Sequence, residues 1–348
     1  MVYSAGLDIG GVNFKGCCVE FNGWNDFTQT CSTHKVSMPS FFVTEFRRFL
    51  CEEGRGIDVL GVTSTAELTP VLFPRLSDGI TSFAGKISEH FSGRVFWMGL
   101  SGELIENNDV IAKPYDVAAA NWVASALLVG RLVEGDCILV DVGSTTTDVI
   151  PIVSGRPDAS GRHDYERLAS SELIYTGALY SNARLVDEVL VDGRRTRTAN
   201  ESFSSVADVH RILGNISDKE YVEYFGELYG YRDPDLAYTR LAHLVCADDT
   251  LLERDIIEDI ARQIYDVQLN EISSALKTVY ERKKGEYGKK PPVVVSGFGA
   301  RFLAAKAAEC AGFGDVVYLE DELGVDASVS TASYAMALFA AQEEATRA

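Results

Sequence analysis

The sequence has few basic residues for its size, and this shortage limits the partners that the protein can bind. Its 32 Lys and Arg side chains stand against 51 Asp and Glu, which gives a formal net charge of −19. Broad binding to nucleic acid or to an anionic membrane surface requires a surplus of positive charge. We therefore expect neither partner. An anionic ligand must be met locally, by backbone N–H groups, a metal ion or a few cations.

Motifs for zinc binding, redox chemistry and export are also missing. The five histidines show no metal-ligand spacing, and the seven cysteines are scattered and form no C-x-x-C pair. A zinc site is therefore not expected, and the pattern is typical of reduced, mostly buried thiols. The N-terminus shows no basic segment followed by a hydrophobic run, and no segment approaches membrane-spanning length. These features predict a cytoplasmic protein.

The chain has room for two domains. It has 348 residues, of which 46% are hydrophobic and 24% charged, as is typical of a globular protein with substantial cores. We expect an N-terminal lobe over residues 1–133 and a C-terminal lobe over 134–325 that includes a helical subdomain at about 200–286. The small-residue helix over 326–345 is expected to pack back on the first lobe.

The most informative stretch is Leu139–Ile150, which reads as an apolar strand, a small polar turn and a second apolar strand. Gly143 permits a tight turn, and the four residues after it add hydroxyl donors to a row of backbone N–H groups. They are Ser144, Thr145, Thr146 and Thr147. This composition predicts a phosphate-binding loop. Asp141, at the end of the buried strand, is placed to hold a hydrated metal ion.

A second copy of this unit lies near the N-terminus. Residues Leu7–Lys15 repeat the order of apolar residues, Asp, apolar residue, Gly and small polar turn, and Asp8 and Asp141 are 133 positions apart (141 − 8). The repetition predicts two related halves that each present a hairpin to one phosphate chain. The residues expected at the phosphates are Gly10, Gly11, Asn13 and Lys15. Two unrelated tight turns are the structural alternative.

Two further candidate ligand contacts follow predicted buried strands. The strand Val293–Ser296 runs into a Gly-x-Gly turn, Gly297 and Gly299, at a helix N-terminus, where the backbone can approach a ligand closely. Glu67 follows the strand Val59–Thr63. Its carboxylate either lies in the ligand crevice of an open α/β sheet or caps a helix, and the sequence does not separate these two roles.

Several other polar residues have two interpretations each. Asn121 lies in an apolar, Ala-rich helix predicted over Val117–Arg131, and is either a satisfied core amide or a ligand contact. The loop residues either line a cleft or are solvated: His163, Asp164 and Arg167. Three clustered cations either bind an anionic group or form a solvated loop: Arg194, Arg195 and Arg197.

The two Asp-Gly hairpins, the Ala-rich helix between the halves and the late Gly-x-Gly turn resemble the actin-like ATPase superfamily of acetate and sugar kinases, Hsp70 and actin. That resemblance implies an α/β fold of two ribonuclease H-like lobes around a central cleft, with a helical insertion in the second half. More specific runs resemble the hydantoinase/oxoprolinase-related proteins of tetrahydromethanopterin-linked one-carbon metabolism, and among them the condensing enzymes of methanofuran biosynthesis. These runs are Leu7–Lys15, Thr65–Leu68, Ala119–Trp122, Asp141–Asp148, Glu172–Gly177, Ala207–Gly214 and Val245–Asp248.

The resemblance implies a transferase. An (aminomethyl)furanmethyl diphosphate loses diphosphate, and the phenol oxygen of a glutamyl-tyramine or a tyrosine derivative captures its methylene carbon as an ether. In this chain Mg²⁺ near Asp8 and Asp141, together with Lys15, would stabilise the leaving diphosphate. Either Glu67 or Glu172 would accept the phenol proton, and the sequence does not choose between them.

Two other functions fit the same superfamily. An ATP-dependent small-molecule kinase would transfer a phosphoryl group through the same two loops. A nucleotide-gated interaction protein, like actin or Hsp70, would bind ATP without a small-molecule substrate. The sequence leaves open whether ATP is bound, whether the protein forms a homo-oligomer, and which tail the acceptor carries.

Overall fold

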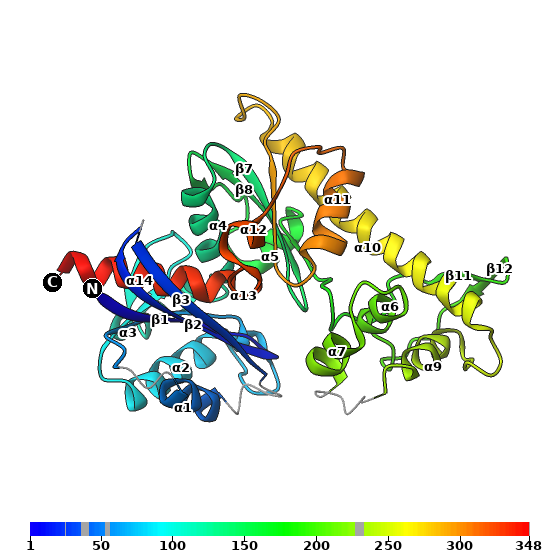
Figure 1. Cartoon of the computed structure of the whole chain (residues 1–348), viewed down its shortest axis with the longest axis horizontal. Helices are drawn as coiled ribbons and strands as arrows, with labels where there is room; N and C mark the ends of the chain where they lie inside the picture. Colours follow the sequence, from blue (N-terminus) through cyan, green and yellow to red (C-terminus); the bar gives the residue numbers. More distant parts are fainter. Residues whose placement is uncertain (25, 36–41, 53–55, 227–232, 348) are drawn as a thin grey trace. The chain divides into compact units, whose positions relative to one another are not determined.

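The computed structural model describes residues 1–24, 26–35, 42–52, 56–226 and 233–347, and the chain forms two compact units (Figure 1). The first unit comprises Met1–Cys137, Ile152–Arg167 and Leu319–Ala348. The second comprises Ile138–Pro151 and Leu168–Tyr318. The chain therefore crosses between the units four times: after Cys137, after Pro151, after Arg167 and after Tyr318.

The first unit is built on a sheet of six strands in the order β3-β2-β1-β4-β5-β6. The central strand β1 pairs antiparallel with β2 and parallel with β4, β3 is antiparallel to β2, and β5 is parallel to β4. The strands are β1 (Val2–Ile9), β2 (Asn13–Gly23), β3 (Asp26–Lys35), β4 (Val59–Ser64), β5 (Arg94–Met98) and β6 (Leu104–Glu106).

Helices cover both faces of this sheet. Aromatic side chains of α1 (Phe42–Glu52) and α2 (Leu76–His90) pack with Leu7 and Phe14 in the core on one face. On the other face α14 (Thr331–Arg347) runs along β1, β2 and β4 (Figure 1). Glycine allows this close approach, because a Cβ at Gly6 would lie 1.8 Å from the Ser333 carbonyl oxygen.

The second unit repeats the strand order of the first. Its main sheet has the order β10-β8-β7-β13-β14, with the short strand β9 off this path. When the strands of each sheet are numbered in chain order without β9, both sheets have the order third, second, first, fourth, fifth. The first and fourth strands are parallel, as are the fourth and fifth, and the second and third are antiparallel. The strands are β7 (Cys137–Val142), β8 (Thr147–Val153), β10 (Leu173–Ile174), β13 (Val293–Ser296) and β14 (Val316–Tyr318), with short β9 (Arg156–Pro157) beside β8. The duplication predicted from the two hairpins is therefore confirmed.

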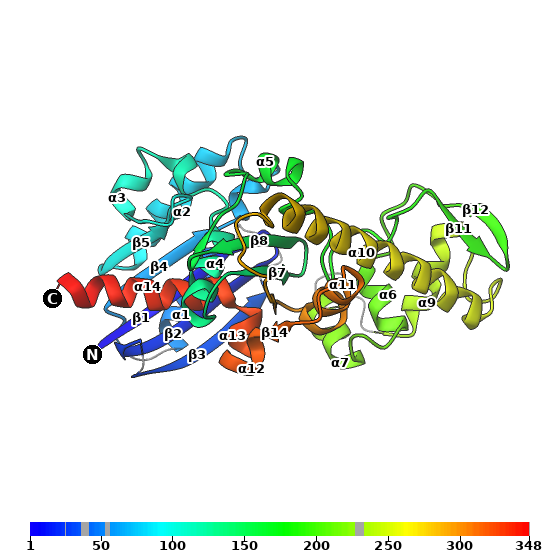
Figure 2. The same ribbon diagram turned by 90° about the horizontal axis from the view of Figure 1, so that it is seen from above.

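A mostly helical segment follows β10. It ends in α10 (Arg254–Lys283), the long unbroken helix in Figure 2. The sequence predicts one long helix here, because apolar residues recur at three- and four-residue spacing from Ile257 to Val279. Six of them are buried, namely Ile257, Ile260, Ile264, Ile272, Leu276 and Val279, whereas Val267 and Leu269 are half-buried. The rest of the segment comprises β11 (Glu188–Val191), β12 (Arg194–Arg197), α6 (Val206–Ile212), α7 (Asp218–Glu220), η4 (Tyr221–Gly226), α9 (Leu236–Ala242) and η5 (His243–Val245).

The remaining helices are short, except for the one that precedes β7 in the chain. That helix is α4 (Asn121–Leu132), which packs on α14. The short ones are η2 (Ala66–Leu68), α3 (Asn107–Val110), η3 (Pro114–Asp116), α5 (Asp164–Ala169), η6 (Ala300–Ala304), α11 (Ala305–Cys310), α12 (Leu319–Leu323) and α13 (Val325–Val329). Within the described part of the chain, no helix has the length and apolar character needed to cross a membrane.

Three expectations differ from the structure or extend beyond it. The helix predicted from Val117 begins at Asn121, because Ala119 has a φ of 51°, in the left-handed region that interrupts a right-handed helix. The sequence also predicts a strand near Thr28–Val36 and a helix over Phe41–Glu53, and the ends Val36, Phe41 and Glu53 lie outside the described residues. Cys17 is disulfide-bonded, so the expectation of reduced thiols is wrong for this residue. The cysteines that are free are Cys18, Cys51, Cys137, Cys246 and Cys310.

Candidate functional site

The first hairpin turns tightly at the carboxyl end of β1. The N–H of Gly10 donates to the carbonyl of Asn13 at 2.9 Å, and a Cβ at Gly10 would lie 2.7 Å from the same oxygen. Gly11 faces Thr69, whose hydroxyl would be 3.4 Å from a Cβ added there. Glycine is therefore required at position 10, and the turn lies against the residues that follow Glu67.

Three polar side chains lie in one row across the sheet beside this turn. Asp8 pairs in register with Lys15 on β2 and with Thr63 on β4, and the Thr63 hydroxyl donates to the Asp8 carboxylate at 3.2 Å. Opposed residues share a face of the sheet, and this row continues the alternation that places Gly6 under α14. The Lys15 ammonium donates to the carbonyl of Val329, at the end of α13, at 2.8 Å.

The second hairpin has the same turn geometry. The N–H of Gly143 donates to the carbonyl of Thr146 at 2.9 Å, as Gly10 does to Asn13. The segment after β10 supports this turn from below: the N–H of Ala178 donates to Gly143, and both Leu179 and Tyr180 donate to the carbonyl of Ser144. The turn predicted for phosphate binding is thus held through its carbonyl groups by a second segment. Thr147 is fully buried and its hydroxyl donates to the carbonyl of Thr176 at 2.7 Å, so this hydroxyl is not available to a phosphate.

The Gly-x-Gly turn packs against the carboxyl end of β7, where the second hairpin turn begins. Gly297 has a φ of 84°, and a Cβ there would lie 2.4 Å from an oxygen of the Asp141 carboxylate. The N–H of Gly299 donates to the carbonyl of Val142 at 2.9 Å, and Ser296 pairs in register with Asp141. In the second unit, therefore, the carboxyl ends of β7 and β13 bring together Asp141, the Ser/Thr turn and the Gly-x-Gly turn. The carboxyl ends of neighbouring parallel strands are where open α/β sheets bind ligands.

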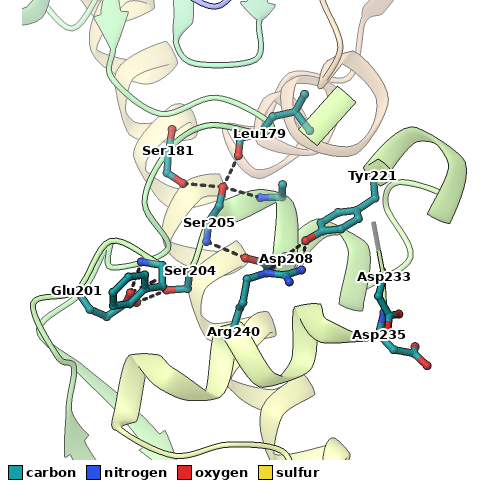
Figure 3. A network of polar contacts seen from close by, with 12 residues as sticks. Leu179, Ser181, Glu201, Ser204, Ser205, Asp208, Tyr221, Asp233, Asp235 and Arg240 are labelled. Atoms are coloured by element: carbon teal, nitrogen blue, oxygen red, sulfur yellow. Dashed lines mark hydrogen bonds and ion pairs between the residues drawn. The ribbon is translucent and has the colours of Figure 1, made fainter. Parts of the chain in front are cut away.

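A buried polar network contacts the segment that supports the Ser144 turn (Figure 3). The Asp208 carboxylate accepts from the Arg240 guanidinium at 2.9 Å and from the Tyr221 hydroxyl at 2.7 Å, and Asp208 itself is fully buried. The N–H of Ser205 donates to the same carboxylate, while its hydroxyl donates to the carbonyls of Leu179 and Ser181. The network thereby connects the helical segment to the chain that supports the Ser144 turn.

Glu67 in the first unit is buried, with 1% of its surface exposed. Its carboxylate accepts a hydrogen bond from the Ser64 hydroxyl at 2.6 Å and another from the N–H of Ala119 at 2.7 Å. The Ser64 hydroxyl is also within 3.2 Å of the carbonyl of Ile9, beside Asp8. The N-cap of η2 has no side-chain cap, so in this structure the carboxylate holds Ala119 rather than capping a helix.

Burial changes the acidity of Glu67. Loss of hydration disfavours the charged carboxylate and raises its pKa from 4.5 to about 7, although the hydrogen bonds from Ser64 and Ala119 act in the opposite direction. The negative charge of Asp164 adds to the increase. A carboxylate with a pKa near neutrality can both accept and release a proton at physiological pH.

Other polar residues of the first unit lie around Glu67. Arg167 is 1% exposed and its guanidinium lies 4.3 Å from the centre of the Trp122 ring, a cation–π contact. It also pairs with Asp164 at 3.4 Å. Of the three loop residues left open by the sequence, Asp164 and Arg167 therefore belong to this buried cluster. Asn121 is half-buried at the first turn of α4.

Glu172, the other proposed base, has a different environment. Its carboxylate is fully buried, pairs with the Arg282 guanidinium at 2.5 Å and accepts from the Ser170 hydroxyl at 2.8 Å. Arg282 lies in the last turn of α10, so the pair connects that helix to the residue before β10. These contacts give Glu172 a structural role, and Glu67 is the better-placed candidate for a base.

The structure also contains residues that sequence reasoning did not select. Gln268 is fully buried on α10, and its amide donates to the Thr176 hydroxyl at 2.8 Å and to the carbonyl of Gly177 at 3.0 Å. Gly177 packs on Thr145, because a Cβ there would lie 2.6 Å from the Thr145 backbone. The available signal was an amide in line with the apolar stripe of α10, four residues after Ile264. A polar side chain at such a position needs a buried partner.

The carboxylates proposed for a metal lie in different units. Asp8 belongs to the first and Asp141 to the second, and neither belongs to a larger cluster of metal-binding side chains. Over the described ranges, no group of three or more His, Cys, Asp and Glu side chains is arranged to hold a metal ion. Each unit alone therefore offers a single carboxylate at a strand end.

Comparisons with known proteins agree with this architecture. Residues 62–343 match the family model described as hydantoinase/oxoprolinase. The chain is 28% identical over 334 residues to a protein of Methanocaldococcus jannaschii named (4-{4-[2-(gamma-L-glutamylamino)ethyl]phenoxymethyl}furan-2-yl)methanamine synthase, covering 95% of this chain and 96% of the relative. A synthase of the same name from Methanococcus vannielii is 29% identical over 223 residues, covering 63% of this chain and 96% of the relative.

Among solved structures, nucleotide-free acetone carboxylase has a similar fold. The TM-score is 0.62 at 13% sequence identity, with 97% of this chain and 70% of that chain covered. This likeness concerns the fold alone. Together with the repeated strand order of the two sheets, it agrees with the two-lobed, actin-like α/β fold that the sequence predicted.

Proposed function

Because the chain belongs to the hydantoinase/oxoprolinase family, and because of its likeness to two synthases over most of its length, we propose that it is an ether-forming transferase of methanofuran biosynthesis. The product in the relatives' name contains a phenoxymethyl group, that is, an ether between a phenol oxygen and a furan-bound methylene carbon. We assign the reaction in which a phenolic γ-glutamyl-tyramine displaces diphosphate from an (aminomethyl)furanmethyl diphosphate.

The single observation that best supports this reaction is the environment of Glu67. A free phenol has a pKa of about 10, so it needs a base as the new bond forms. The Glu67 carboxylate, with a pKa of about 7, is held by the Ser64 hydroxyl and the N–H of Ala119. In the proposed reaction it accepts the phenol proton while the oxygen attacks the methylene carbon and the bond from carbon to diphosphate breaks.

The leaving diphosphate would be stabilised by the two turns. Backbone N–H groups and hydroxyls of residues 144–146 are the donors of the second unit, and Lys15 is a cation of the first. The Gly143 N–H and the Thr147 hydroxyl are not among them, because they donate to the carbonyls of Thr146 and Thr176. The Lys15 ammonium has three donors, and its bond to Val329 uses one of them. As negative charge develops on the leaving oxygen, these donors lower the energy of the transition state.

Mg²⁺ fits the residues at these turns. It is usually held in proteins by one or two carboxylates together with substrate phosphates. Asp8 and Asp141 each stand at the end of a central strand next to a turn, so each unit would supply one such carboxylate. Bound there, the ion would neutralise charge on the diphosphate.

The test is an incubation of the protein and Mg²⁺ with the furanmethyl diphosphate and γ-glutamyl-tyramine. We expect an ether product by mass spectrometry and one diphosphate released for each ether formed. Formation of the ether without release of diphosphate would contradict the proposal, and so would the absence of both products. If no ether forms but ADP appears when ATP and a metabolite are supplied, the protein is a kinase instead. ATP binding without turnover of any substrate would indicate a nucleotide-gated interaction protein.

A further inference from the structure

The first unit contains a pocket next to the Glu67 cluster. Its volume is about 170 Å³, and its lining comes from the loop after β5, from α4 and from the segment around β9. The polar part of the lining comprises Ser101, Gly102, Trp122, Arg156, Ser160 and Arg162. A cavity of about 150 Å³ can hold a ligand the size of benzene. The pocket can therefore take a charged group with a few carbon atoms.

Two cations at this pocket are an exception in a chain with a net charge of −19. Arg156 makes no ion pair with any side chain that the structure describes, and its guanidinium would lie 3.4 Å from a Cβ added at Gly102. Arg162 pairs with Asp116 at 2.8 Å, but half of its side chain is exposed. One carboxylate therefore stands against two guanidinium groups, and a ligand with a negative charge is favoured.

Trp122 forms part of the wall of the same pocket. Its side chain is 5% exposed, and its indole N–H has no hydrogen-bond partner among the described residues. The contact with Arg167 holds the ring in place. The ring lines the pocket, so a ligand bound there would change the environment of the indole.

Residues of the pocket wall are also connected to Glu67, the proposed base, by contacts within the first unit. Trp122 lies three residues after Ala119, whose N–H holds the Glu67 carboxylate. Arg167, on the Trp122 ring, pairs with Asp164, which in turn acts electrostatically on Glu67. Two short series of contacts within the first unit therefore connect the pocket wall at Trp122 to the Glu67 carboxylate.

We propose that this pocket binds the amino-acid end of the acceptor's γ-glutamyl tail, an inference that rests on the proposed function. A γ-linked glutamate keeps a free α-carboxylate and a free α-ammonium. Arg156 and Arg162 are suited to the carboxylate, because a guanidinium offers two parallel donors that match two carboxylate oxygens. Asp116, beside Arg162, provides the opposite charge for the ammonium.

The kinetic test compares acceptors and variants. Arg156→Gln should raise KM for γ-glutamyl-tyramine at least tenfold, while KM for the diphosphate substrate stays within twofold. With tyramine, which lacks the carboxylate, wild type and variant should have the same KM. Arg156→Lys keeps the charge and should recover part of the loss. Arg262→Gln, which removes an exposed arginine from α10, is the matched control. An unchanged KM for γ-glutamyl-tyramine in Arg156→Gln overturns the proposal.

A binding test gives a result even if no ether forms. It therefore separates failure of the proposed pocket from failure of the proposed function. The protein has three tryptophans, and the indole N–H groups of Trp24 and Trp97 already donate to Gln342 and Asn107. In ¹⁵N-labelled protein, γ-glutamyl-tyramine should shift the indole signal of Trp122, assigned with Trp122→Phe, and leave the other two in place. Tyramine at the same concentration should not shift it. An equal response to both compounds, or none to either, contradicts the proposed pocket.

Discussion

The carboxylate of Glu67 accepts a 2.7 Å hydrogen bond from the backbone N–H of Ala119, a residue with a φ of 51°. Non-glycine residues in the left-handed region carry backbone strain, and such residues are frequent at functional sites. The strained residue lies just before Ala120, the N-cap of α4, and its N–H donates to the carboxylate rather than within a helix. This relationship places a carboxylate of raised pKa at a defined position beside the first turn, and several predictions depend on it.

The first prediction concerns the proposed base. Glu67→Gln keeps the shape of the side chain and an oxygen that can accept from Ala119, but it removes the proton acceptor. We expect kcat for ether formation to fall by about 10²- to 10⁴-fold, the usual contribution of general base catalysis. Glu172→Gln provides the comparison, because its carboxylate is engaged by Arg282. A larger kcat loss in Glu172→Gln, with both variants folded by circular dichroism, would reverse the assignment.

The second prediction concerns pH. The base must be ionised, so kcat should rise with pH and level off above about 7, the pKa of Glu67. Stability should change in the opposite direction. The native state holds this proton more tightly than the unfolded chain, so the free energy of unfolding should fall between pH 4.5 and 7, by on the order of 3 kcal/mol. Urea titrations of wild type and Glu67→Gln across this range measure the difference, which should be absent from the variant.

The third prediction concerns the metal. Asp141→Asn should lower diphosphate release at least a hundredfold at limiting Mg²⁺, because an amide is a weaker ligand than a carboxylate. The melting temperature should change little, and chelation of divalent ions should abolish the wild-type activity. If the variant retains normal activity over a titration of Mg²⁺, Asp141 is not a metal ligand.

The fourth prediction concerns the contact between the sheet and α14. A methyl group at Gly6 would lie 1.8 Å from the Ser333 carbonyl oxygen, and backbone atoms cannot move aside easily. Gly6→Ala should therefore destabilise the protein by about 1–3 kcal/mol or more in urea titrations. Gly85→Ala on α2 is the matched control, since a Cβ there meets nothing within 4 Å. It should stabilise the helix by up to about 1 kcal/mol.

The fifth prediction concerns the network of Figure 3. Arg240→Met leaves the buried Asp208 carboxylate without its cationic partner and should cost about 3–5 kcal/mol of unfolding free energy. Because Ser205 connects Asp208 to Leu179 and Ser181, diphosphate release should also decline. Arg262→Met, at an exposed ion pair of α10, should cost less than about 1 kcal/mol. Equal losses in the two variants would show that the buried pair has no special role.

The sequence by itself predicted the duplicated hairpins, the long amphipathic helix and the Gly-x-Gly turn. These features depend on local chemistry: Gly10 and Gly143 each follow an acid by two residues, and the turn at Gly10 needs a residue without a side chain. The apolar stripe of α10 is likewise a property of a single segment. The family motifs add the reaction class, because they are runs of neighbouring residues.

Only the tertiary structure separated the two carboxylates. Glu67 and Glu172 follow or precede strands in similar ways in the sequence, but one meets the N–H of Ala119, 52 positions away, and the other meets Arg282, 110 positions away. A pKa and an ion pair depend on burial and on partners that are distant in sequence, so no local pattern encodes them. The same reason applies to Gln268 and to the pocket at Trp122, whose residues come together only when the sheets and helices pack.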